Sequence, residues 1–274
     1  MTLLHISRSI AVAAAGVLLL SACGDDGDDA DTTPQNGADT ADYNLVEDGV
    51  LTVCSEVPYP PFEFEDSDAP SGYSGFDMDL MQAIADGIGL EMRVQAVGFD
   101  PLQSGTVFAA NQCDVGASAM TITDERKENL DFSDPYYDSL QSLLAAADGD
   151  INSIDDLDGR AVGVQQATTG QSYAEGNAPE GASIQSFPGD PELWAALQAG
   201  NIDAILQDFP VNYEHQEADD GYVIVETYET DEQYGFALGK DERPALLAAI
   251  NEQLAELRDD GTYDEVYAEY FSVD

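Results

Sequence analysis

The chain has 274 residues, in which 8 Lys and Arg stand against 55 Asp and Glu, for a formal net charge of −47 at pH 7. A polyanion of this density repels phosphates, which argues against a nucleic-acid partner. The acids are spread along the chain rather than clustered. We therefore interpret them as a solvated acidic shell suited to a salt-rich habitat, in preference to a device for capturing cations.

The first 22 residues have the layout of a secretory signal. Arg8 precedes an apolar run over residues 10–20, which is too short to span a bilayer as a mature helix. Cys23 follows Leu-Ser-Ala, a sequence that resembles the bacterial lipobox, in which the cysteine is lipidated and becomes the new N-terminus. We predict a signal peptide over residues 1–22 and a lipid anchor at Cys23 on the outer side of the cell membrane, in the periplasm or at the cell surface. The alternative is an ordinary cleaved signal with an incidental cysteine.

The next segment, residues 23–48, is predicted to be a disordered acidic tether. It consists of Gly, Asp, Thr, Asn and Ala with almost nothing apolar, so it cannot bury enough surface to fold. The remainder, from about residue 45 to residue 274, is long enough for one large lobe or two small ones.

Short apolar strands alternate with amphipathic helices along this remainder. Strands are predicted over residues 50–54, 92–97, 113–119, 161–164, 183–187 and 202–206. Helices are predicted over residues 76–88, 101–110, 169–175, 191–198, 243–258 and 263–270, with a further helix start at Thr123, where acids follow a threonine cap. Alternation at this pitch predicts parallel sheets covered by helices on both faces.

Two segments share one pattern, in which an apolar helix ends at Asn or Gly and an Asp then opens a strand. They are residues 108–116 and 196–205. The repetition predicts two related α/β lobes rather than one continuous sheet. Because ligands of open α/β sheets bind at the carboxyl ends of strands, we expect the site in a cleft between the lobes.

Two cysteines remain once Cys23 is lipidated. Cys54 and Cys113 each lie in or beside a predicted strand, and an even pair outside the cytoplasm favours a disulfide between neighbouring strands over two free buried thiols. His5 lies in the signal and His215 stands alone, so we expect no metal site, no cofactor and no Ser-His-Asp nucleophile.

Six short motifs occur in order: YPPFEF at 59–64, GFDMDL at 75–80, AMTITDER at 119–126, FSDPYY at 132–137, VGVQQATT at 162–169 and DGTY at 260–263. From about residue 51 to 271 the series resembles extracellular solute-binding protein family 3, the polar amino-acid-binding proteins of ABC importers. The resemblance implies an α/β, bilobal, periplasmic-binding-protein-like (type II) fold whose two lobes are joined by a two-strand hinge. Lobe 1 is expected over residues 49–138 plus 234–274 and lobe 2 over residues 139–233, in a monomer that delivers its amino acid to a membrane permease.

The resemblance also assigns the groups that bind the ligand's α-carboxylate. Arg126 can grip a carboxylate with two parallel hydrogen bonds; by itself it could equally be a surface partner of Asp124 or Glu128. Thr168 and Thr169 open a helix, where free backbone N–H groups and hydroxyls suit the same carboxylate from the opposite lobe. The alternative is plain helix capping, a role that Thr169 can fill at the same time as it binds the carboxylate.

The ligand's α-ammonium is matched by three further positions. Asp208 follows a predicted strand and can accept hydrogen bonds from an ammonium, although by itself it could cap the helix that begins at Phe209. The carbonyl of Ala119 and the hydroxyl of Thr121 are similar to the family's remaining contacts with the ammonium and the carboxylate.

The ligand's side chain is matched by two aromatic and two polar positions. Tyr59 and Phe99 correspond to an aromatic pair whose flat faces suit aliphatic stems, guanidinium and amide groups. Glu56 corresponds to an acidic position that meets the distal cation of basic amino acids, and Gln165 suits an amide or a guanidinium. These residues favour arginine or another basic amino acid, with glutamine next.

Two other functions deserve comparison with a binding receptor. A periplasmic enzyme of the cyclohexadienyl dehydratase type on the same scaffold needs a general acid beside a ring that is not an amino acid. The presence of both Arg126 and Asp208, a matched pair for a zwitterion, speaks against it. A sensor would carry signalling domains, which we do not expect because the chain stops soon after its last predicted helix. A sensor without such domains would pass its ligand to a separate receptor.

Overall fold

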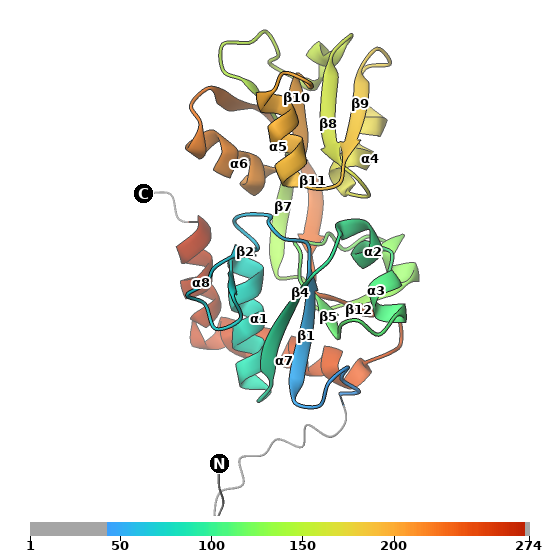
Figure 1. Ribbon diagram of the computed structural model, residues 1–274, viewed down its shortest axis with the longest axis vertical. Coiled ribbons are helices and arrows are strands. Elements are labelled where there is room, and N and C mark those ends of the chain that lie inside the picture. The colour runs from blue at the N-terminus through green and yellow to red at the C-terminus, as the bar shows by residue number, and fades with distance from the viewer. Residues whose placement is uncertain (1–42, 272–274) are drawn as a thin grey trace, which may run out of the picture. The chain divides into compact units, whose positions relative to one another are not determined.

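The computed structural model describes residues 43–271, which all belong to one compact unit. The predicted signal peptide, the predicted anchor Cys23 and residues 23–42 of the predicted tether lie outside the described residues. The last part of the predicted tether, residues 43–48, is described and is not disordered, since Tyr43 and Leu45 pack against a hydrophobic core. The described part folds into two lobes, each built on a mixed five-stranded sheet with helices packed against it (Figure 1). Over residues 43–271, no helix combines the length and the apolar character needed to cross a membrane.

The sheet of lobe 1 has the strand order β4-β1-β5-β12-β6. Its strands are β1 (Val50–Ser55), β4 (Glu91–Ala96), β5 (Val115–Gly116), β6 (Leu130–Phe132) and β12 (Ala237–Gly239). Its helices are α1 (Phe76–Gly87), α2 (Phe99–Gln103), α3 (Thr106–Ala109), α7 (Pro244–Asp260) and α8 (Thr262–Phe271), and β2 (Phe64–Glu65) pairs with β3 (Tyr73–Ser74) beside it. Strand β1 lies parallel to β4 and β5, whereas β12 is antiparallel to β5 and β6.

Strand β1 is buried on both faces because helices cover both sides of the sheet. Alternate side chains enter different cores: Leu51 and Val53 pack in the cluster of α1 and α7, while Cys54 packs in the cluster of α2 and α3. The apolar face predicted for α1 is confirmed, since Phe76 and Ile84 are fully buried in the first cluster. This double cover explains why β1 reads as a nearly continuous apolar run.

The sheet of lobe 2 has the strand order β11-β7-β10-β8-β9. Its elements are β7 (Tyr137–Ala146), the 3-10 turn Ile154–Leu157, β8 (Ala161–Gln165), α4 (Thr169–Asn177), β9 (Ser183–Phe187), α5 (Asp190–Gln198), β10 (Ala204–Asp208), α6 (Phe209–Ala218) and β11 (Tyr222–Tyr234). Strand β8 is parallel to β9 and β10, and β7 is antiparallel to β10 and β11.

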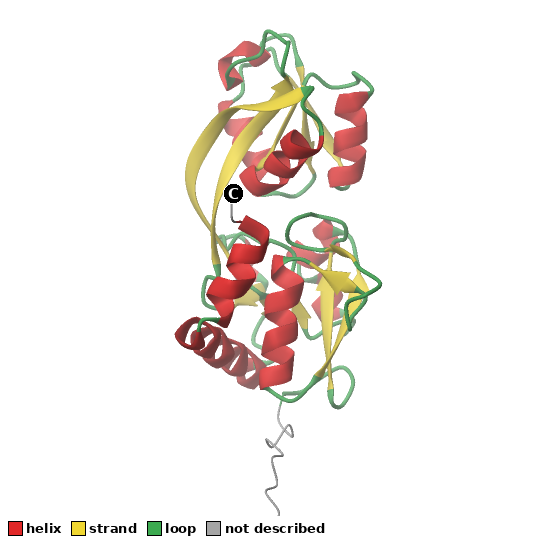
Figure 2. Cartoon of the chain, turned by 90° about the vertical axis from the view of Figure 1, so that its left-hand side faces the viewer, coloured by secondary structure: helices red, strands yellow, loops and turns green. Residues whose placement is uncertain are grey.

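Two long strands connect the lobes. Strands β7 and β11 pair antiparallel from Tyr137 opposite Tyr234 to Ala146 opposite Tyr222, with an irregularity in register between Tyr228 and Glu232. They run as a curved ribbon from one lobe into the other (Figure 2). This ribbon is the two-strand hinge that the resemblance implies. We propose that the lobes divide within it, at the boundaries 138/139 and 233/234 predicted from the sequence.

Four local predictions were wrong. Both sheets are mixed rather than parallel, because the hinge strands and β12 run antiparallel to their neighbours. The helix predicted over residues 101–110 is divided at Gly105, whose φ of 80° is left-handed and ends α2 before α3 begins. The strand predicted over residues 113–119 is reduced to β5. The helix start at Thr123 yields only a 3-10 turn, Arg126–Glu128, because the polar segment after it offers no apolar face to pack.

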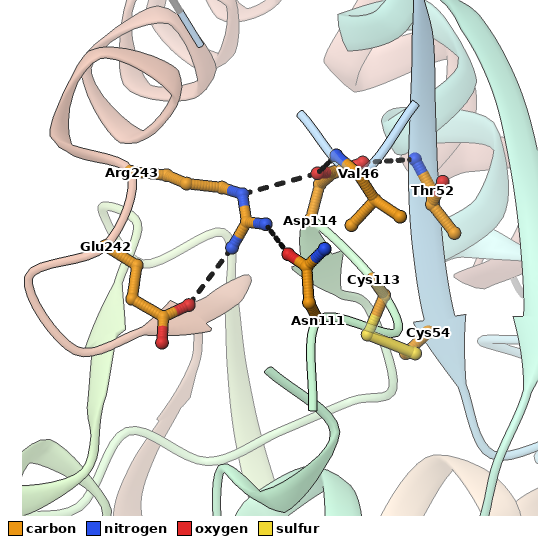
Figure 3. The surroundings of a disulfide bond; sticks show 8 residues. All are labelled: Val46, Thr52, Cys54, Asn111, Cys113, Asp114, Glu242 and Arg243. Atoms are coloured by element: carbon orange, nitrogen blue, oxygen red, sulfur yellow. Dashed lines mark hydrogen bonds and ion pairs between the residues drawn. A yellow bond between two sulfur atoms is a disulfide. The ribbon is translucent and has the colours of Figure 1, made fainter. Parts of the chain in front are cut away.

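A disulfide and a buried ion pair join the chain's distant parts in lobe 1 (Figure 3). Cys54 at the end of β1 bonds to Cys113 just before β5, the pairing that the sequence favours. Nearby, Arg243 Nε lies 3.3 Å from Asp114 Oδ1. Asp114 also accepts hydrogen bonds from the N–H groups of Val46 (2.7 Å) and Thr52 (2.8 Å). The cluster thereby fixes the start of the folded chain and β1 to the segment that leads into α7.

Candidate functional site

One pocket between the lobes is lined by every residue that the sequence assigns to ligand binding. Lobe 1 contributes Glu56, Tyr59, Phe99, Ala119, Thr121 and Arg126, and lobe 2 contributes Gln165, Thr168, Thr169 and Asp208. Ser118 also lines the pocket and was not predicted from the sequence, although it immediately precedes the AMTITDER motif. Residues from both lobes thus face one space.

The strand ends explain why these residues meet. Glu56 directly follows β1, Ala119 lies shortly after β5, and Gln165 and Asp208 are the last residues of β8 and β10. All four are therefore at the carboxyl ends of strands, where loops and helix starts leave polar groups accessible to a ligand. The site lies where the pattern of alternating strands and helices predicts it.

Arg126 is a buried cation without a carboxylate partner. It is only 6% exposed, and its guanidinium donates to the carbonyls of Thr121 (2.7 Å) and Ala167 (3.1 Å). Over residues 43–271, no Asp or Glu forms an ion pair with it, and the surface-pair alternative is wrong because Lys127 pairs with Asp124 instead. Burial lowers the pKa of Arg126 to about 10, which the negative charges of Asp208 and Glu232 partly oppose.

The aromatic ring of Phe99 covers this guanidinium. The ring centroid lies 5.2 Å from Arg126 Cζ, an arrangement that attracts the cation to the face of the ring. Tyr59 and Phe99 are 6% and 7% exposed, so both rings are available to a ligand only inside the pocket. Phe99 therefore orients Arg126 as well as lining the space for a side chain.

The two threonines at the start of α4 have different roles. Thr168 caps the helix: its hydroxyl accepts from the N–H of Gln171 (3.1 Å) and donates to the carbonyl of Gln165 (2.8 Å). Thr169, for which helix capping was the alternative role, instead donates to Glu232 Oε2 (2.7 Å), and so does Thr121 from the other lobe (2.8 Å). The assignment of the cap to Thr169 was wrong, and its hydroxyl faces the pocket region.

Glu232 is the acid that the sequence analysis missed. It is carried by hinge strand β11, and its carboxylate oxygens also lie 3.3 and 3.4 Å from Gln141 Nε2 on the other hinge strand. Glu232 lies directly after an irregularity in the pairing of β11 with β7, between Tyr228 and Glu232. Glu232 stands in a polar run without a motif, so only the pairing of the two hinge strands could have revealed it.

Asp208 points into the site rather than capping the helix that follows it. The hydroxyl of Tyr59 donates to its Oδ2 (2.7 Å), the amide of Gln141 donates to its Oδ1 (2.6 Å), and its side chain makes no cap to α6. Burial, together with the charge of Glu232, raises the pKa of Asp208 to about 6. The helix-cap alternative is therefore wrong.

Glu56 is a second buried acid. It is 8% exposed, and its Oε2 accepts a hydrogen bond of 2.8 Å from Gln165 Nε2 on the opposite lobe. Burial raises its pKa to about 7, although the hydrogen bond from Gln165 favours the ionised form. Near neutral pH this carboxyl is poised to lose its proton when a cation approaches.

Two residues beside the pocket have a left-handed backbone that is uncommon outside glycine. The φ angles are 45° at Ala119 and 65° at Ala167. The N–H of Ala119 donates to Asp77 Oδ2 (2.8 Å), and the carbonyl of Ala167 accepts from Arg126. Such conformations cost about 1–3 kcal/mol each and gather at functional sites, where surrounding contacts hold them. They bring backbone polar groups to the pocket that a regular strand would pair with its neighbours.

Comparison with known proteins agrees with this geometry. The family model of bacterial extracellular solute-binding proteins, family 3, matches residues 51–273. The glutamine-binding protein GlnH of the Bacillus subtilis ABC transporter is 32% identical, over 94% of this chain and 94% of its own. The L-cystine-binding protein TcyJ of Escherichia coli K12 is 30% identical, over 100% of this chain and 99% of its own.

Solved structures give the same picture. An ancestral arginine-binding protein, solved bound to arginine and separately to glutamine, superposes with a TM-score of 0.76 and 34% identity, covering 82% of this chain and 99% of its own. The two-lobed architecture, the hinge and the family match all agree. The chain belongs to the bacterial extracellular solute-binding proteins of family 3, and the relatives named here are binding proteins for glutamine, L-cystine and arginine.

Proposed function

We propose that this protein captures arginine, or another basic amino acid, in the pocket between its lobes and delivers it to an ABC permease, with glutamine as the next candidate ligand. The observation that carries the proposal is the separation of charge in the pocket. Arg126 is buried without a carboxylate, and Glu56 is buried without a cation among the described residues. A ligand that brings both missing charges stabilises both groups at once.

Each charged group of a basic amino acid has a complementary group in the pocket. The α-carboxylate suits Arg126, Thr121 and the N-terminus of α4, where unpaired backbone N–H groups favour an anion. The α-ammonium suits Asp208 and the carbonyl of Ala119. A distal guanidinium suits Glu56 and Gln165, between the rings of Tyr59 and Phe99.

The balance of charge also favours a cationic ligand. Two acids that line the pocket, Glu56 and Asp208, stand against its single cation, Arg126. A zwitterion with a neutral side chain leaves this excess of negative charge unchanged, whereas arginine at neutral pH adds one net positive charge. Glutamine remains second because its amide can still pair with Gln165.

Binding couples to closure through contacts that cross the cleft. Tyr59 in lobe 1 bonds to Asp208 in lobe 2, and Gln165 in lobe 2 bonds to Glu56 in lobe 1. A ligand that contacts both lobes favours the closed form over an open one, with the bending absorbed by the hinge near residues 137–141 and 229–235. We propose that the closed form is the one that the permease receives.

We further propose that the protein is a monomeric lipoprotein held outside the cytoplasm by a lipid at Cys23, on the strength of the lipobox-like sequence and the acidic tether after it. The test is detergent phase partitioning of the full-length protein expressed in bacterial cells. We expect the wild-type protein to enter the detergent phase and Cys23→Ala to stay in the aqueous phase. Release of both from the membrane fraction by salt alone would contradict the anchor.

The dehydratase alternative is not favoured. Such chemistry needs a general acid beside a ring without an α-ammonium, whereas Arg126 and Asp208 suit the two ends of a zwitterion. The named relatives compared above are transport-binding proteins rather than enzymes.

The deciding experiment is isothermal titration of residues 43–274 against single amino acids, after unfolding and refolding to remove any ligand carried through purification. We expect one tight ligand class, led by arginine. Tight binding of glutamine with no binding of arginine would overturn the ligand assignment while leaving the receptor role. The absence of binding to every amino acid, with turnover of a prephenate-like acid, would overturn the receptor itself.

A further inference from the structure

Two carboxyl groups that the ligand site does not use lie fully buried behind it. Glu63 belongs to the YPPFEF motif and Asp77 to the GFDMDL motif, and both side chains are inaccessible to solvent. In the described part of the chain neither forms an ion pair with a basic residue. Two adjacent buried negative charges without a cation are strongly unfavourable, so this pair needs a proton.

The hydrogen bonds hold the two carboxyl groups on consecutive residues of one loop, and the charge of Asp77 acts on Glu63. Ser118 Oγ donates to Glu63 Oε1 (2.7 Å), and the N–H of the next residue, Ala119, donates to Asp77 Oδ2 (2.8 Å). The backbones also meet, since the N–H of Asp77 donates to the carbonyl of Phe62 (3.0 Å). Each group keeps one buried oxygen, Glu63 Oε2 and Asp77 Oδ1, with no hydrogen-bond partner among the described residues.

The surroundings decide which acid holds the proton. Asp77 Oδ2 accepts two hydrogen bonds, from Ala119 N–H and from the hydroxyl of Tyr136 (2.7 Å), and Asp77 lies in the first turn of α1, where the helix favours a negative charge. Among the described residues, the carboxyl group of Glu63 accepts a hydrogen bond only from the hydroxyl of Ser118. The other titratable groups that act on the pair are Glu56 and Asp208, which act on Glu63, and Tyr136, which donates to Asp77, and none of them supplies a positive charge. Burial raises the pKa of both acids, that of Glu63 far above its ordinary value and that of Asp77 to about 7.

We propose that Glu63 is a neutral acid that donates its proton from Oε2 to Asp77 Oδ1, and that this shared proton positions the ligand-binding loop at Ser118 and Ala119. The resulting chain of hydrogen bonds runs from the N–H of Glu56 to Ser118 Oγ (3.1 Å), and from Ser118 Oγ to Glu63. From Glu63 it continues to Asp77, which holds Ala119 in its left-handed conformation. Glu63 and Asp77 are thus positioning residues rather than ligand contacts.

The protonation is tested without any ligand, by infrared spectroscopy of the refolded protein at pH 8 in the C=O region of protonated carboxylic acids. The difference between wild type and E63Q is expected to show one acid band that shifts in D2O. E65Q, which changes the exposed neighbour on β2, is the matched control and is expected to keep the band. A wild-type band that persists in E63Q places the proton elsewhere, and a wild type without the band shows that both acids are ionised; either result overturns the proposal.

The positioning role rests on the proposed amino-acid binding and is tested by calorimetry with arginine. In E63Q the amide N–H can replace the acid proton, so its affinity is expected within twofold of wild type. E63M offers neither donor nor acceptor and is expected to bind at least tenfold more weakly. Wild-type affinity in a folded E63M overturns the positioning role. Should E63M not fold, S118A breaks the same chain and is expected to weaken arginine at least threefold while keeping the acid band; unchanged affinity in S118A overturns the role. If wild type binds no amino acid, the proposed function fails while the infrared result still decides the protonation.

Discussion

Lobe 1 buries two arginines to nearly the same depth, and their surroundings differ completely. Arg243 is 4% exposed and Arg126 is 6% exposed. Arg243 has carboxylate partners in Asp114 and Glu242, and further acceptors in Asn111 and Asn44. Arg126 has two backbone carbonyls and an aromatic ring, but no carboxylate partner within residues 43–271.

The acids show the same contrast. Burial raises the pKa of Asp114, but Arg243 and two backbone N–H groups hold the carboxylate and oppose that shift. Glu56 accepts one amide hydrogen bond and has no cation beside it in the part of the chain that the structure describes. Burial of a charged residue therefore does not indicate function by itself. A buried charge that the fold leaves without its counterion is the better indicator, because the fold tolerates its cost only where a ligand offsets it.

The largest effect is expected from Arg126→Ala. Removal of the guanidinium leaves the ligand's carboxylate buried without its cation, at a cost of about 3–5 kcal/mol in binding. Calorimetry should then show a loss of arginine affinity of at least about a hundredfold. The free energy of unfolding of the ligand-free protein should fall only slightly, because the carbonyls of Thr121 and Ala167 lose a donor but no carboxylate loses an ion-pair partner. Undiminished affinity would show that Arg126 does not bind the ligand. A large loss of stability would show that Arg126, like Arg243, serves the fold.

The mirror-image change is Arg243→Met. Here Asp114 loses the partner that balances its buried charge, so the free energy of unfolding should fall by about 3 kcal/mol. Urea titration at pH 7 measures the loss, and the arginine affinity of the folded fraction should stay at the wild-type value. A variant with normal stability and weakened binding would contradict the assignment of this cluster to the fold.

Glu56→Gln tests the same contrast for an acid, because Glu56, unlike Asp114, has no cation partner among the described residues. Loss of the charge should weaken arginine by about 2 kcal/mol and glutamine by much less, because only arginine brings a cation to this position. Equal losses for the two ligands would remove Glu56 from specificity.

The same variant should gain stability without ligand. Since the folded-state pKa of Glu56, about 7, lies above its ordinary value of 4.5, the folded protein holds a proton that the unfolded chain releases over this range. Its contribution to stability therefore falls as pH rises from about 4.5 to 7, and Glu56→Gln should unfold at higher urea than wild type at pH 8. A variant that is less stable than wild type at pH 8 would show that the charge of Glu56 is already balanced.

Local patterns predicted the elements that are locally determined. The apolar repeat of Phe76, Ile84 and their neighbours specifies α1, and short apolar runs specify β1, β8, β9 and β10. Strand β11 was missed because its polar stretch over residues 226–233 shows no apolar alternation. Strand β7 was missed although Leu143, Leu144 and Ala145 form a buried apolar run. The two strands are held by pairing with each other and, for β7, also with β10, which requires the assembled fold.

The candidate site was found through its motifs rather than through its geometry. All of its predicted residues line the pocket, but the contacts between them could not be foreseen. Tyr59 and Asp208 are 149 residues apart, and their hydrogen bond depends on both lobes. The role of Thr168 as the cap, and the presence of Glu232, likewise follow only from the assembled backbone.

A pH titration of binding tests whether Glu56 is balanced only by ligand. A guanidinium beside Glu56 should lower its pKa from about 7, so arginine binding near pH 7 should release up to one proton. Arginine affinity should rise from pH 6 to pH 8 more steeply than glutamine affinity. Calorimetry in buffers of different ionisation enthalpy measures the proton directly. Equal proton release with both ligands would place the titration at Asp208, whose pKa of about 6 responds to the shared α-ammonium.

The smallest effect is expected from Glu232→Gln. This change tests whether Glu232 competes with the ligand's carboxylate for hydrogen-bond donors beside Arg126. The carboxylate of Glu232 already holds the hydroxyls of Thr121 and Thr169 that the ligand's carboxylate is proposed to take. Each hydroxyl has one proton to donate, so Glu232 competes with the ligand and also repels it. Removing the charge should strengthen arginine binding by about 1 kcal/mol, or roughly fivefold. Glu229→Gln, an exposed change on the same strand, should leave affinity unchanged. Weaker binding in Glu232→Gln would instead show that this acid assists the ligand's ammonium, which would make it a partner of Asp208 rather than a competitor at Arg126.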